Sequence, residues 1–197
     1  MSKKPEILET QIIARSQFFA VEQVRLRFAN GEERLYERLL EWDARSVIIV
    51  AVQPPDSILL IREYACGIDQ RALTLPTGMV EPGETDLEAA NRELQEEVGL
   101  AADHIRELGV LTLAPGHLSH KITVLLAEGL YAQSLPGDEP EDMEVIPVRL
   151  CDFDEMVHSG KINEARAIAA VYMAKSELEK VASQRTRPQA VRCVTAS

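Results

Sequence analysis

The sequence predicts an α/β protein: one main domain with a smaller β-rich segment at its N-terminus. Three observations indicate this fold class: several short apolar runs typical of strands, a capped helix in the middle of the chain, and a long helix near its end. The 197 residues suffice for one domain with its own core, whereas two full domains would fit poorly. We therefore expect an N-terminal sheet over residues 1–45, the main domain over 46–183 and a flexible tail over 184–197.

The N-terminal segment from residue 7 to residue 40 is predicted to form strands. Within it, Asn30-Gly31 lies between the stretches VRLRFA and EERLYERL. This dipeptide between two strand-forming stretches is a strong signal for a hairpin turn. An antiparallel sheet is therefore expected at the N-terminus.

The main domain is predicted to contain five strands and a long C-terminal helix. The strands are expected at Val47–Val52, Ser57–Tyr64, Arg106–Leu113, Lys121–Leu130 and Val145–Arg149. Two prolines and an aspartate predict a turn between the first two strands, and the segment that then leads to Gly78 is expected to be a loop. The helix is expected at Asn163–Ser183, with one side formed by Ala167, Ala170, Val171 and Ala174.

The stretch GMVEPGETDLEAANRELQEEVGL, residues 78–100, predicts a helix with signals at both ends. Thr85 can cap its first turn, and Glu88 three positions later can complete a capping box. Gly99 can supply the left-handed residue that often ends a helix. A helix from about Asp86 to Val98 is therefore expected.

An apolar stripe and an acidic stripe are expected side by side on this helix. At ~100° per residue, the apolar stripe contains Leu87, Ala90, Leu94 and Val98, and the acidic stripe contains Glu93, Glu96 and Glu97. Neighbouring glutamates repel by up to about 4 kcal/mol per pair at ~4 Å and an effective dielectric of ~20, so a positive charge is expected among them. Carboxylate oxygens suit a hard divalent cation such as Mg²⁺ or Mn²⁺. The alternative is a solvated acidic face, the usual meaning of a glutamate-rich helix.

The flanking residues favour the metal site, because the whole stretch resembles the Nudix box. Its fixed positions are filled by Gly78, Glu84, Arg92, Glu93, Leu94, Glu96, Glu97, Gly99 and Leu100. The resemblance implies a Nudix α/β/α sandwich with a mixed sheet. It also implies the hydrolysis of a nucleoside diphosphate linked to another group. The box does not identify the substrate.

The resemblance to the Nudix box implies a role for each of its polar residues. The expected metal ligands are Gly78, through its carbonyl group, and the carboxylates of Glu93, Glu96 and Glu97, with two or three Mg²⁺ or Mn²⁺ ions per site. Glu96 is also expected to take part in catalysis. Arg92 resembles the arginine that orients a neighbouring glutamate through a salt bridge.

Features outside the box resemble the ADP-ribose pyrophosphatase group of this superfamily. Pro115 stands fifteen residues after Leu100, and the segment 138–145, DEPEDMEV, resembles an acidic loop of that group. By position, Glu139 is the candidate general base and Glu141 an additional metal ligand. The alternative is a solvated acidic turn, which is frequent in proteins. The stretches LIREYACGIDQ and NEARA resemble the branch of the group that hydrolyses ADP compounds.

The same resemblance implies a homodimer built with the N-terminal sheet, whose aromatic residues stack on adenine. Phe18 and Tyr36 lie at similar places, and Glu37 could bond the base edge. Aromatic residues in strands are more often part of the core, which is the alternative for both. Arg62 is expected to hold a phosphate group with its planar guanidinium, and a surface salt bridge is its alternative role.

Composition and charge narrow the range of partners. The formal net charge of −11 disfavours binding to nucleic acid or to anionic membranes. No signal-peptide pattern is visible, and the longest apolar run, residues 47–52, is too short to span a bilayer, so a cytoplasmic protein is expected. Widely spaced cysteines without a CxxC pair argue against a disulfide framework or a zinc site; they are Cys66, Cys151 and Cys193.

The predicted function is the metal-dependent hydrolysis of the pyrophosphate bond of ADP-linked compounds. ADP-ribose, NADH and diadenosine polyphosphates are all candidate substrates, and the expected products are AMP and a phosphorylated remainder. Two alternatives remain open at this point: a Nudix domain that binds a nucleotide without turnover, and a pyrophosphatase for another nucleotide sugar.

Overall fold

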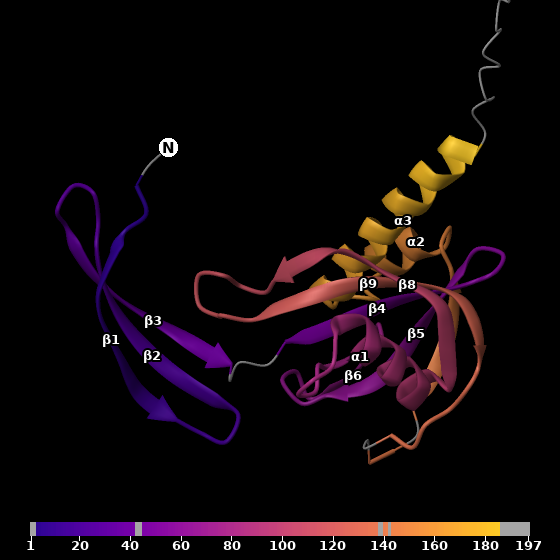
Figure 1. Cartoon of the computed structure of the whole chain (residues 1–197), viewed down its shortest axis with the longest axis horizontal. Coiled ribbons are helices and arrows are strands. Elements are labelled where there is room, and N and C mark those ends of the chain that lie inside the picture. Colours follow the sequence, from indigo (N-terminus) through magenta and orange to yellow (C-terminus); the bar gives the residue numbers. More distant parts are fainter. Residues whose placement is uncertain (1–2, 42–44, 138–139, 142, 186–197) are drawn as a thin grey trace, which may run out of the picture.

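The computed structural model describes residues 3–41, 45–137, 140–141 and 143–185, and these residues form two separate sheets (Figure 1). The N-terminal sheet has the order β1-β2-β3 and is antiparallel throughout. Its strands are β1 (Glu6–Arg15), β2 (Phe19–Arg27) and β3 (Glu33–Glu41). The larger sheet has the order β10-β5-β4-β9-β8, with β6 paired to β5 and β7 paired to β4.

The strands of the larger sheet follow the predicted strands and extend most of them by one to six residues. They are β4 (Ser46–Gln53), β5 (Ser57–Ala65), β6 (Gln70–Thr74), β7 (Thr77–Met79), β8 (Leu100–Thr112), β9 (Lys121–Ala132) and β10 (Glu144–Arg149). β4 and β9 are parallel, and the other pairs are antiparallel. The predicted mixed sheet is therefore confirmed. The prediction of a loop before Gly78 is wrong, because the strands β6 and β7 lie in this segment.

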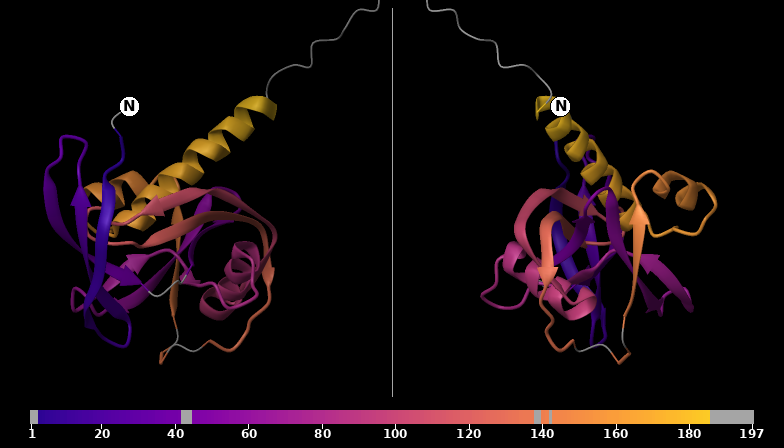
Figure 2. Two further views of the ribbon diagram at one scale, coloured as in Figure 1. Left: turned by 60° about the vertical axis from the view of Figure 1, so that its left-hand side comes forward. Right: turned by 90° about the vertical axis from the view of Figure 1, so that its right-hand side faces the viewer.

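The N-terminal sheet forms a lobe of its own beside the main domain (Figures 1 and 2). Its predicted hairpin turn is confirmed: Gly31 has a φ of 85°, and the Asn30 side chain accepts a hydrogen bond from the Glu32 N–H at 3.1 Å. Backbone bonds tie β3 to the loop after β8. The Leu39 N–H donates to the His117 carbonyl at 2.8 Å, and the Ser119 N–H donates to the Leu39 carbonyl at 3.1 Å.

Helices cover both faces of the larger sheet. α1 (Asp86–Glu93) lies on one face, and α2 (Phe153–His158) and α3 (Ala165–Arg185) lie on the other (Figure 2). The predicted small residues of α3 are all buried against the sheet: Ala167, Ala170, Val171 and Ala174. This arrangement confirms the α/β/α sandwich. α2 was not predicted, and among the described residues no helix is both long and apolar enough to cross a membrane.

The helix of the acidic stretch begins as predicted. Thr85 accepts a hydrogen bond from the Glu88 N–H, and the Glu88 carboxylate accepts one from the Thr85 N–H, which completes the capping box. Gly99, with a φ of 73°, forms the C-terminal cap. The α-helix ends at Glu93, however, and continues as the single π-helical turn η1 (Leu94–Val98).

The buried side of this helix differs from the predicted apolar stripe. Ala90 and Leu94 are fully buried, whereas Leu87 is 44% exposed. The neighbouring Ala89, which was not predicted to face inward, is fully buried instead. Two adjacent alanines let the helix backbone lie close to the sheet, because neither carries a bulky side chain.

Leu94→Ala and Leu87→Ala form a matched pair that tests the difference in burial between these two leucines. Leu94 is buried in the cluster between α1 and the sheet, so its truncation should lower the free energy of unfolding by about 2–5 kcal/mol. Leu87→Ala should change it by less than about 1 kcal/mol, because the side chain is nearly half exposed. Urea unfolding of both variants measures the difference. Equal losses would contradict the observed orientation of the helix.

Candidate active site

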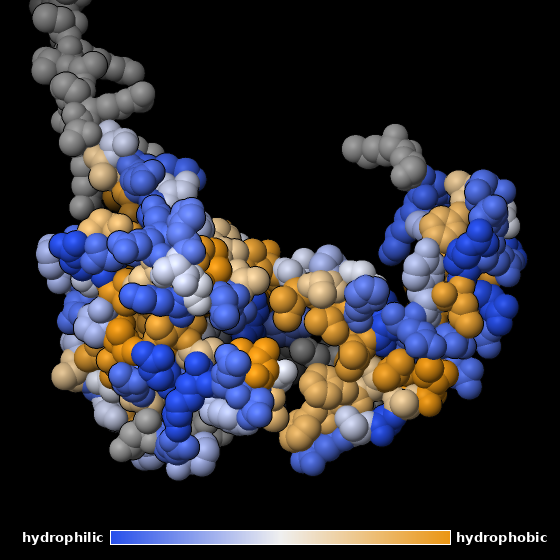
Figure 3. Space-filling view, turned by 180° about the vertical axis from the view of Figure 1, so that it is seen from behind, coloured by the Kyte–Doolittle hydropathy of each residue, from blue (hydrophilic) through white to orange (hydrophobic). Residues whose placement is uncertain are grey.

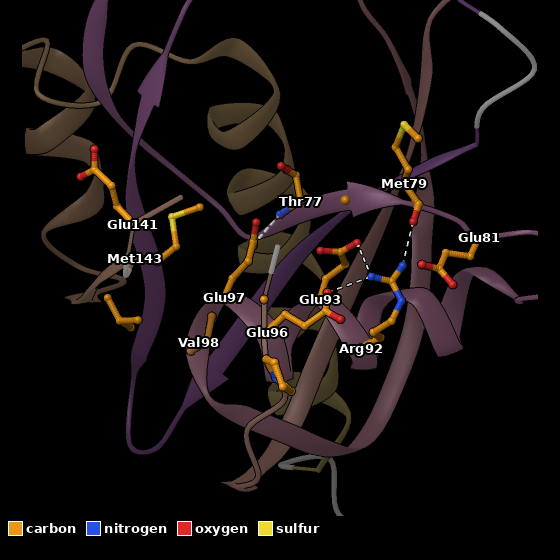
Figure 4. A pocket seen from close by; sticks show the side chains of 14 residues that line it. Thr77, Met79, Glu81, Arg92, Glu93, Glu96, Glu97, Val98, Glu141 and Met143 are labelled. Atoms are coloured by element: carbon orange, nitrogen blue, oxygen red, sulfur yellow. Dashed lines mark hydrogen bonds and ion pairs between the residues drawn. The ribbon is translucent and has the colours of Figure 1, made fainter. Parts of the chain in front are cut away.

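A cleft of about 740 Å³ lies where η1, β7 and the segment before β10 meet (Figure 4). Most of its polar lining comes from the acidic stretch. The lining residues are Thr77, Gly78, Met79, Glu81, Arg92, Glu93, Glu96, Glu97, Val98, Pro136, Gly137, Glu141, Met143 and Val145. The structure thus brings Gly78, Arg92, Glu93, Glu96 and Glu97 of the box into one cleft and places Glu141 beside them.

Gly78 lies in β7, where the backbone passes directly over the acidic helix. Hydrogen bonding to β4 places Gly78 opposite Val47. A Cβ atom at Gly78 would overlap the carboxyl group of Glu93, so no larger residue fits without displacing that carboxylate. Strand pairing therefore brings a backbone segment and a carboxylate to the same point.

Arg92 lies at the centre of the acidic residues. Its Nε and Nη2 bond the Glu84 carboxylate at 2.9 and 3.1 Å, and its Nη1 bonds Glu93 at 2.8 Å and Glu96 at 2.9 Å. Nη2 also donates to the Met79 carbonyl at 2.9 Å. One guanidinium thus connects three carboxylates and the end of β7. The predicted salt bridge between Arg92 and a neighbouring glutamate is confirmed.

These contacts shift the pKa values of both partners. The hydrogen bond to Glu84 is the main cause that raises the pKa of Arg92, and the bonds to Glu93 and Glu96 raise it further, against the opposing effect of burial. The pKa of Glu84 is lowered, first by the hydrogen bond from Arg92 and then by the bond that its carboxylate accepts from the Glu81 N–H. Both groups are therefore held in their charged forms.

Glu97 is fixed separately from Arg92. Its side chain is about nine-tenths buried, and its Oε2 accepts a hydrogen bond from the Thr77 N–H at 3.1 Å (Figure 4). Glu93 is buried to a similar degree, whereas the side chain of Glu96 is 19% exposed. The cleft therefore presents two nearly buried carboxylates and a more accessible third one.

The donor set of this cleft fits a hard divalent cation. Carboxylate oxygens of Glu93, Glu96 and Glu97 and the backbone at Gly78 line the same space, and oxygen ligands are those that Mg²⁺ and Mn²⁺ prefer. In the described part of the chain, no three His, Cys, Asp or Glu side chains are already arranged as a metal site. Arg92 instead bonds one oxygen of Glu93, Oε1, and one oxygen of Glu96, Oε2.

The acidic loop after β9 contributes Glu141 from the opposite side of the cleft (Figure 4). Arg71 on β6 binds the Glu141 carboxylate at 2.5 Å, and this hydrogen bond raises the pKa of Arg71. Arg71 was not predicted as a site residue, because nothing in the sequence links it to a position 70 residues later. Glu139, the predicted general base, lies outside the described residues.

A second pocket of about 400 Å³ adjoins the cleft and shares Glu141 and Met143 with it. Arg62, Tyr64 and Arg71 line this pocket. Arg62 bonds the Glu144 carboxylate at 2.7 Å, which is the salt bridge considered as its alternative role. The position beside the cleft keeps Arg62 within the candidate site.

The residues predicted to bind adenine lie on the N-terminal sheet and do not line the cleft of their own chain. Phe18 and Tyr36 are 67% and 46% exposed, so neither is a core residue. Tyr36 packs against Phe28 with ring centroids 6.4 Å apart, and Glu37 accepts a hydrogen bond from Gln23 at 3.4 Å. One chain alone does not bring these side chains to the glutamates of the cleft.

Two family models match the sequence, and together they cover both sheets. The NUDIX domain matches residues 42–172, and the NudE-type Nudix hydrolase N-terminal domain matches residues 5–38. The chain therefore belongs to the Nudix family. The two matches meet close to the boundary between the N-terminal sheet and the main domain.

Curated relatives and a solved structure place the chain within one branch of this family. It is 40% identical over 177 residues to the ADP compounds hydrolase NudE of Escherichia coli, covering 90% of this chain and 95% of the relative. It is 28% identical over 173 residues to the ADP-ribose pyrophosphatase of Bacillus subtilis, covering 83% and 91%. The crystal structure of an ADP compounds hydrolase superposes with a TM-score of 0.85 at 39% identity, covering 92% and 97% of the two chains. These similarities indicate a Nudix pyrophosphohydrolase.

Glu84→Gln should reveal the bond with Arg92 through the pH dependence of stability. The folded-state pKa of Glu84 lies below its ordinary value of 4.5, so its charge stabilises the fold fully above that pH. The stabilisation is lost as the pH falls from 4.5 through the lowered pKa. Urea unfolding between pH 7 and pH 3 should show wild type more stable than the variant at neutral pH, with the difference shrinking on acidification. A difference that stays constant over this range would contradict the assignment.

Proposed function

We propose that this protein hydrolyses the pyrophosphate bond of ADP-linked small molecules and releases AMP and a phosphorylated remainder. The observation that carries the proposal is the cleft in which Glu93, Glu96 and Glu97 gather beside the backbone of Gly78. Similarity to an ADP compounds hydrolase and to an ADP-ribose pyrophosphatase, over most of each chain, supports the substrate class. ADP-ribose, NADH and diadenosine polyphosphates are the compounds to test first.

The metal ligands in this proposal are the Gly78 carbonyl and the carboxylates of Glu93, Glu96, Glu97 and Glu141. Bound Mg²⁺ or Mn²⁺, as two or three ions, would neutralise the diphosphate and lower the pKa of a coordinated water. Glu97 is already held in place by the Thr77 N–H, and Glu93 is held by Arg92. Because Glu93 and Glu97 are also nearly buried, they form the rigid part of the site, and the more exposed Glu96 and Glu141 form its adjustable part.

The chain supplies the proton acceptor and the contacts to the remainder of the substrate. We assign the role of general base to Glu139 and name Glu96, on the helix, as a second catalytic carboxylate. Arg62 and Arg71 line the adjoining pocket, so we assign them to the phosphate groups that extend beyond the scissile bond. Each arginine would exchange its present glutamate partner for phosphate oxygens.

We further propose a homodimer in which the N-terminal sheet of one chain completes the cleft of the other. Phe18 and Tyr36 do not line the cleft of their own chain, yet both expose an aromatic ring. Hydrophobic patches are visible on the surface of the N-terminal lobe (Figure 3). The sheet exposes these further large apolar side chains: Ile7, Ile12, Ile13, Phe19 and Leu35. Exposed apolar patches typically mark interaction surfaces, and two-fold homodimers are the commonest assemblies.

An assay panel tests the activity and ranks the substrates. ADP-ribose, NADH, diadenosine triphosphate and a GDP-sugar are incubated with the protein and Mg²⁺ or Mn²⁺, and nucleoside monophosphate release is measured by chromatography. Release of AMP from the ADP compounds supports the proposal. Tight binding of ADP-ribose without release of AMP would instead indicate a nucleotide sensor, and preference for the GDP-sugar would indicate another substrate class.

Glu97→Gln should remove most of the turnover and leave the fold intact. The amide keeps the shape of the side chain and loses the charge that holds a cation, so kcat with Mg²⁺ should fall by more than tenfold, or ~1.4 kcal/mol. Mg²⁺ should raise the melting temperature of wild type more than that of the variant. Glu155→Gln, an exposed position on α2, is the control and should behave as wild type. Activity of Glu97→Gln within tenfold of wild type would contradict the metal assignment.

Tyr36→Ala tests both adenine stacking and the assignment of that contact to the partner chain. Loss of one stacking interaction, worth ~1–3 kcal/mol, should raise KM for ADP-ribose about 5- to 150-fold. Tyr131→Ala, another half-exposed tyrosine outside the cleft, is the control.

Co-expression of Tyr36→Ala and Glu97→Gln chains then distinguishes the two placements of Tyr36. Heterodimers contain one complete site only if Tyr36 acts across the interface, so low-KM activity should reappear in the isolated heterodimer. Activity that remains as low as in the parent variants would contradict the contribution from the partner, and a monomer in sedimentation velocity would contradict the dimer itself.

A further inference from the structure

The π-helical turn η1 changes which backbone groups are available next to the cleft. The Gly99 N–H donates to the Leu94 carbonyl five residues earlier. In an α-helix the same N–H would donate to the carbonyl of residue 95, four residues earlier. The Gln95 carbonyl accepts its hydrogen bond from outside the helix instead, from the Leu135 N–H at 3.1 Å.

The side chain of Gln95 strengthens this connection. It is 6% exposed, and its amide group donates to the Asn91 carbonyl at 2.8 Å. Its oxygen accepts a hydrogen bond from the side-chain amide of Gln133 at 2.8 Å. The Gln133 N–H in turn donates to the Gly99 carbonyl at 3.2 Å. Three hydrogen bonds therefore join residues 133–135 to η1.

These bonds hold the beginning of the segment that forms the far side of the cleft. Pro136 and Gly137 follow directly and line the cleft, and a Cβ atom on Gly137 would lie 3.5 Å from the Glu96 carbonyl. The chain reaches Glu141 four residues later and joins β10 at Glu144. The path of this segment thus starts from a point fixed to the turn that carries Glu96 and Glu97.

We propose that Gln95 and Gln133 act as positioning residues that fix the loop segment 133–137, which leads towards Glu141, relative to the metal-binding glutamates. Gln95 stands at a position that the Nudix box leaves open, and Gln133 lies outside the box. The pair would therefore be a feature of this chain and not of the motif. The proposal rests on the proposed function, because it assigns the loop a part in catalysis.

The alternative is a purely structural pair that stabilises the end of the helix. The two roles differ in what they predict. A structural role lowers the melting temperature and leaves kcat of the folded enzyme unchanged. A positioning role lowers kcat, because groups on the loop no longer lie opposite the glutamates, and leaves KM nearly unchanged when Arg62 and the N-terminal sheet bind the substrate.

Gln133→Met and Gln95→Met test the proposal on the full-length protein with ADP-ribose and Mg²⁺. Methionine is similar in length and makes no comparable hydrogen bond. Gln133 is exposed, so its substitution leaves the core intact. Each variant should lower kcat about 5- to 20-fold with KM within about twofold of wild type. The kcat of the double variant should be about as low as that of the more impaired single variant, because the two side chains share one hydrogen bond. Gln53→Met, an exposed glutamine at the end of β4, is the matched control.

Hydrogen exchange provides a readout that does not depend on activity. In both variants, the amides of residues 133–135 and 137 should exchange at least tenfold faster than in wild type, with unchanged exchange in α3 as internal control. The proposal would be overturned if the kcat of Gln133→Met lay within twofold of the kcat of the Gln53→Met control. Unchanged hydrogen exchange in the loop would overturn it as well. If wild type releases no AMP from any compound in the panel, the proposed function fails. Faster exchange in the variants would then still support the anchoring of the loop.

Discussion

The acidic cleft depends on one cation that the chain itself provides. Arg92 bonds Glu84, Glu93 and Glu96 and also the backbone carbonyl of Met79, so a single side chain joins the helix, the preceding loop and β7. A planar guanidinium with several donors can serve such a set, whereas an ammonium group could not reach all four acceptors in fixed directions. The repulsion among the glutamates is therefore reduced before any metal ion binds. One guanidinium cannot neutralise every carboxylate in the cleft, however, and in the proposed function the remaining negative charge would attract the divalent cation.

The sheet holds this electrostatic arrangement in position. The central strand β4 is completely buried from Val47 to Ala51, and it contacts α1 on one face and α3 on the other. Ala89 and Ala90 allow α1 to lie close to the sheet, which brings Glu93 directly under Gly78. Packing in the core thus holds the helix so close to β7 that a Cβ atom at Gly78 would overlap the Glu93 carboxyl group. A site that must hold ions in a fixed geometry benefits from a support of this kind.

Local features of the fold could be predicted from the sequence because each depends on a few neighbouring residues. The capping box at Thr85 and the left-handed Gly99 are examples.

Features that depend on distant residues could not be predicted in this way. Leu87 fits the apolar periodicity and is still 44% exposed, because the packing of the helix on the sheet, and not the periodicity alone, determines which side faces inward. Arg71 meets Glu141 only through the pairing of β6 with β5 and β5 with β10. The adenine contact of Tyr36, if it comes from a second chain, cannot be read from one sequence or from one chain.

Each of the three arginines that line the cleft or the adjoining pocket is paired with a glutamate: Arg92 with the box carboxylates, Arg71 with Glu141 and Arg62 with Glu144. In a protein with a net charge of −11, this pairing matters for a substrate that is itself a polyanion. Arginines already bonded to carboxylates attract a diphosphate weakly. On the proposed mechanism, a cation that binds Glu141 removes the partner of Arg71, and the freed guanidinium can then bond phosphate oxygens. Binding of metal and binding of substrate would then favour each other, because the same carboxylate cannot hold an ion and an arginine equally well.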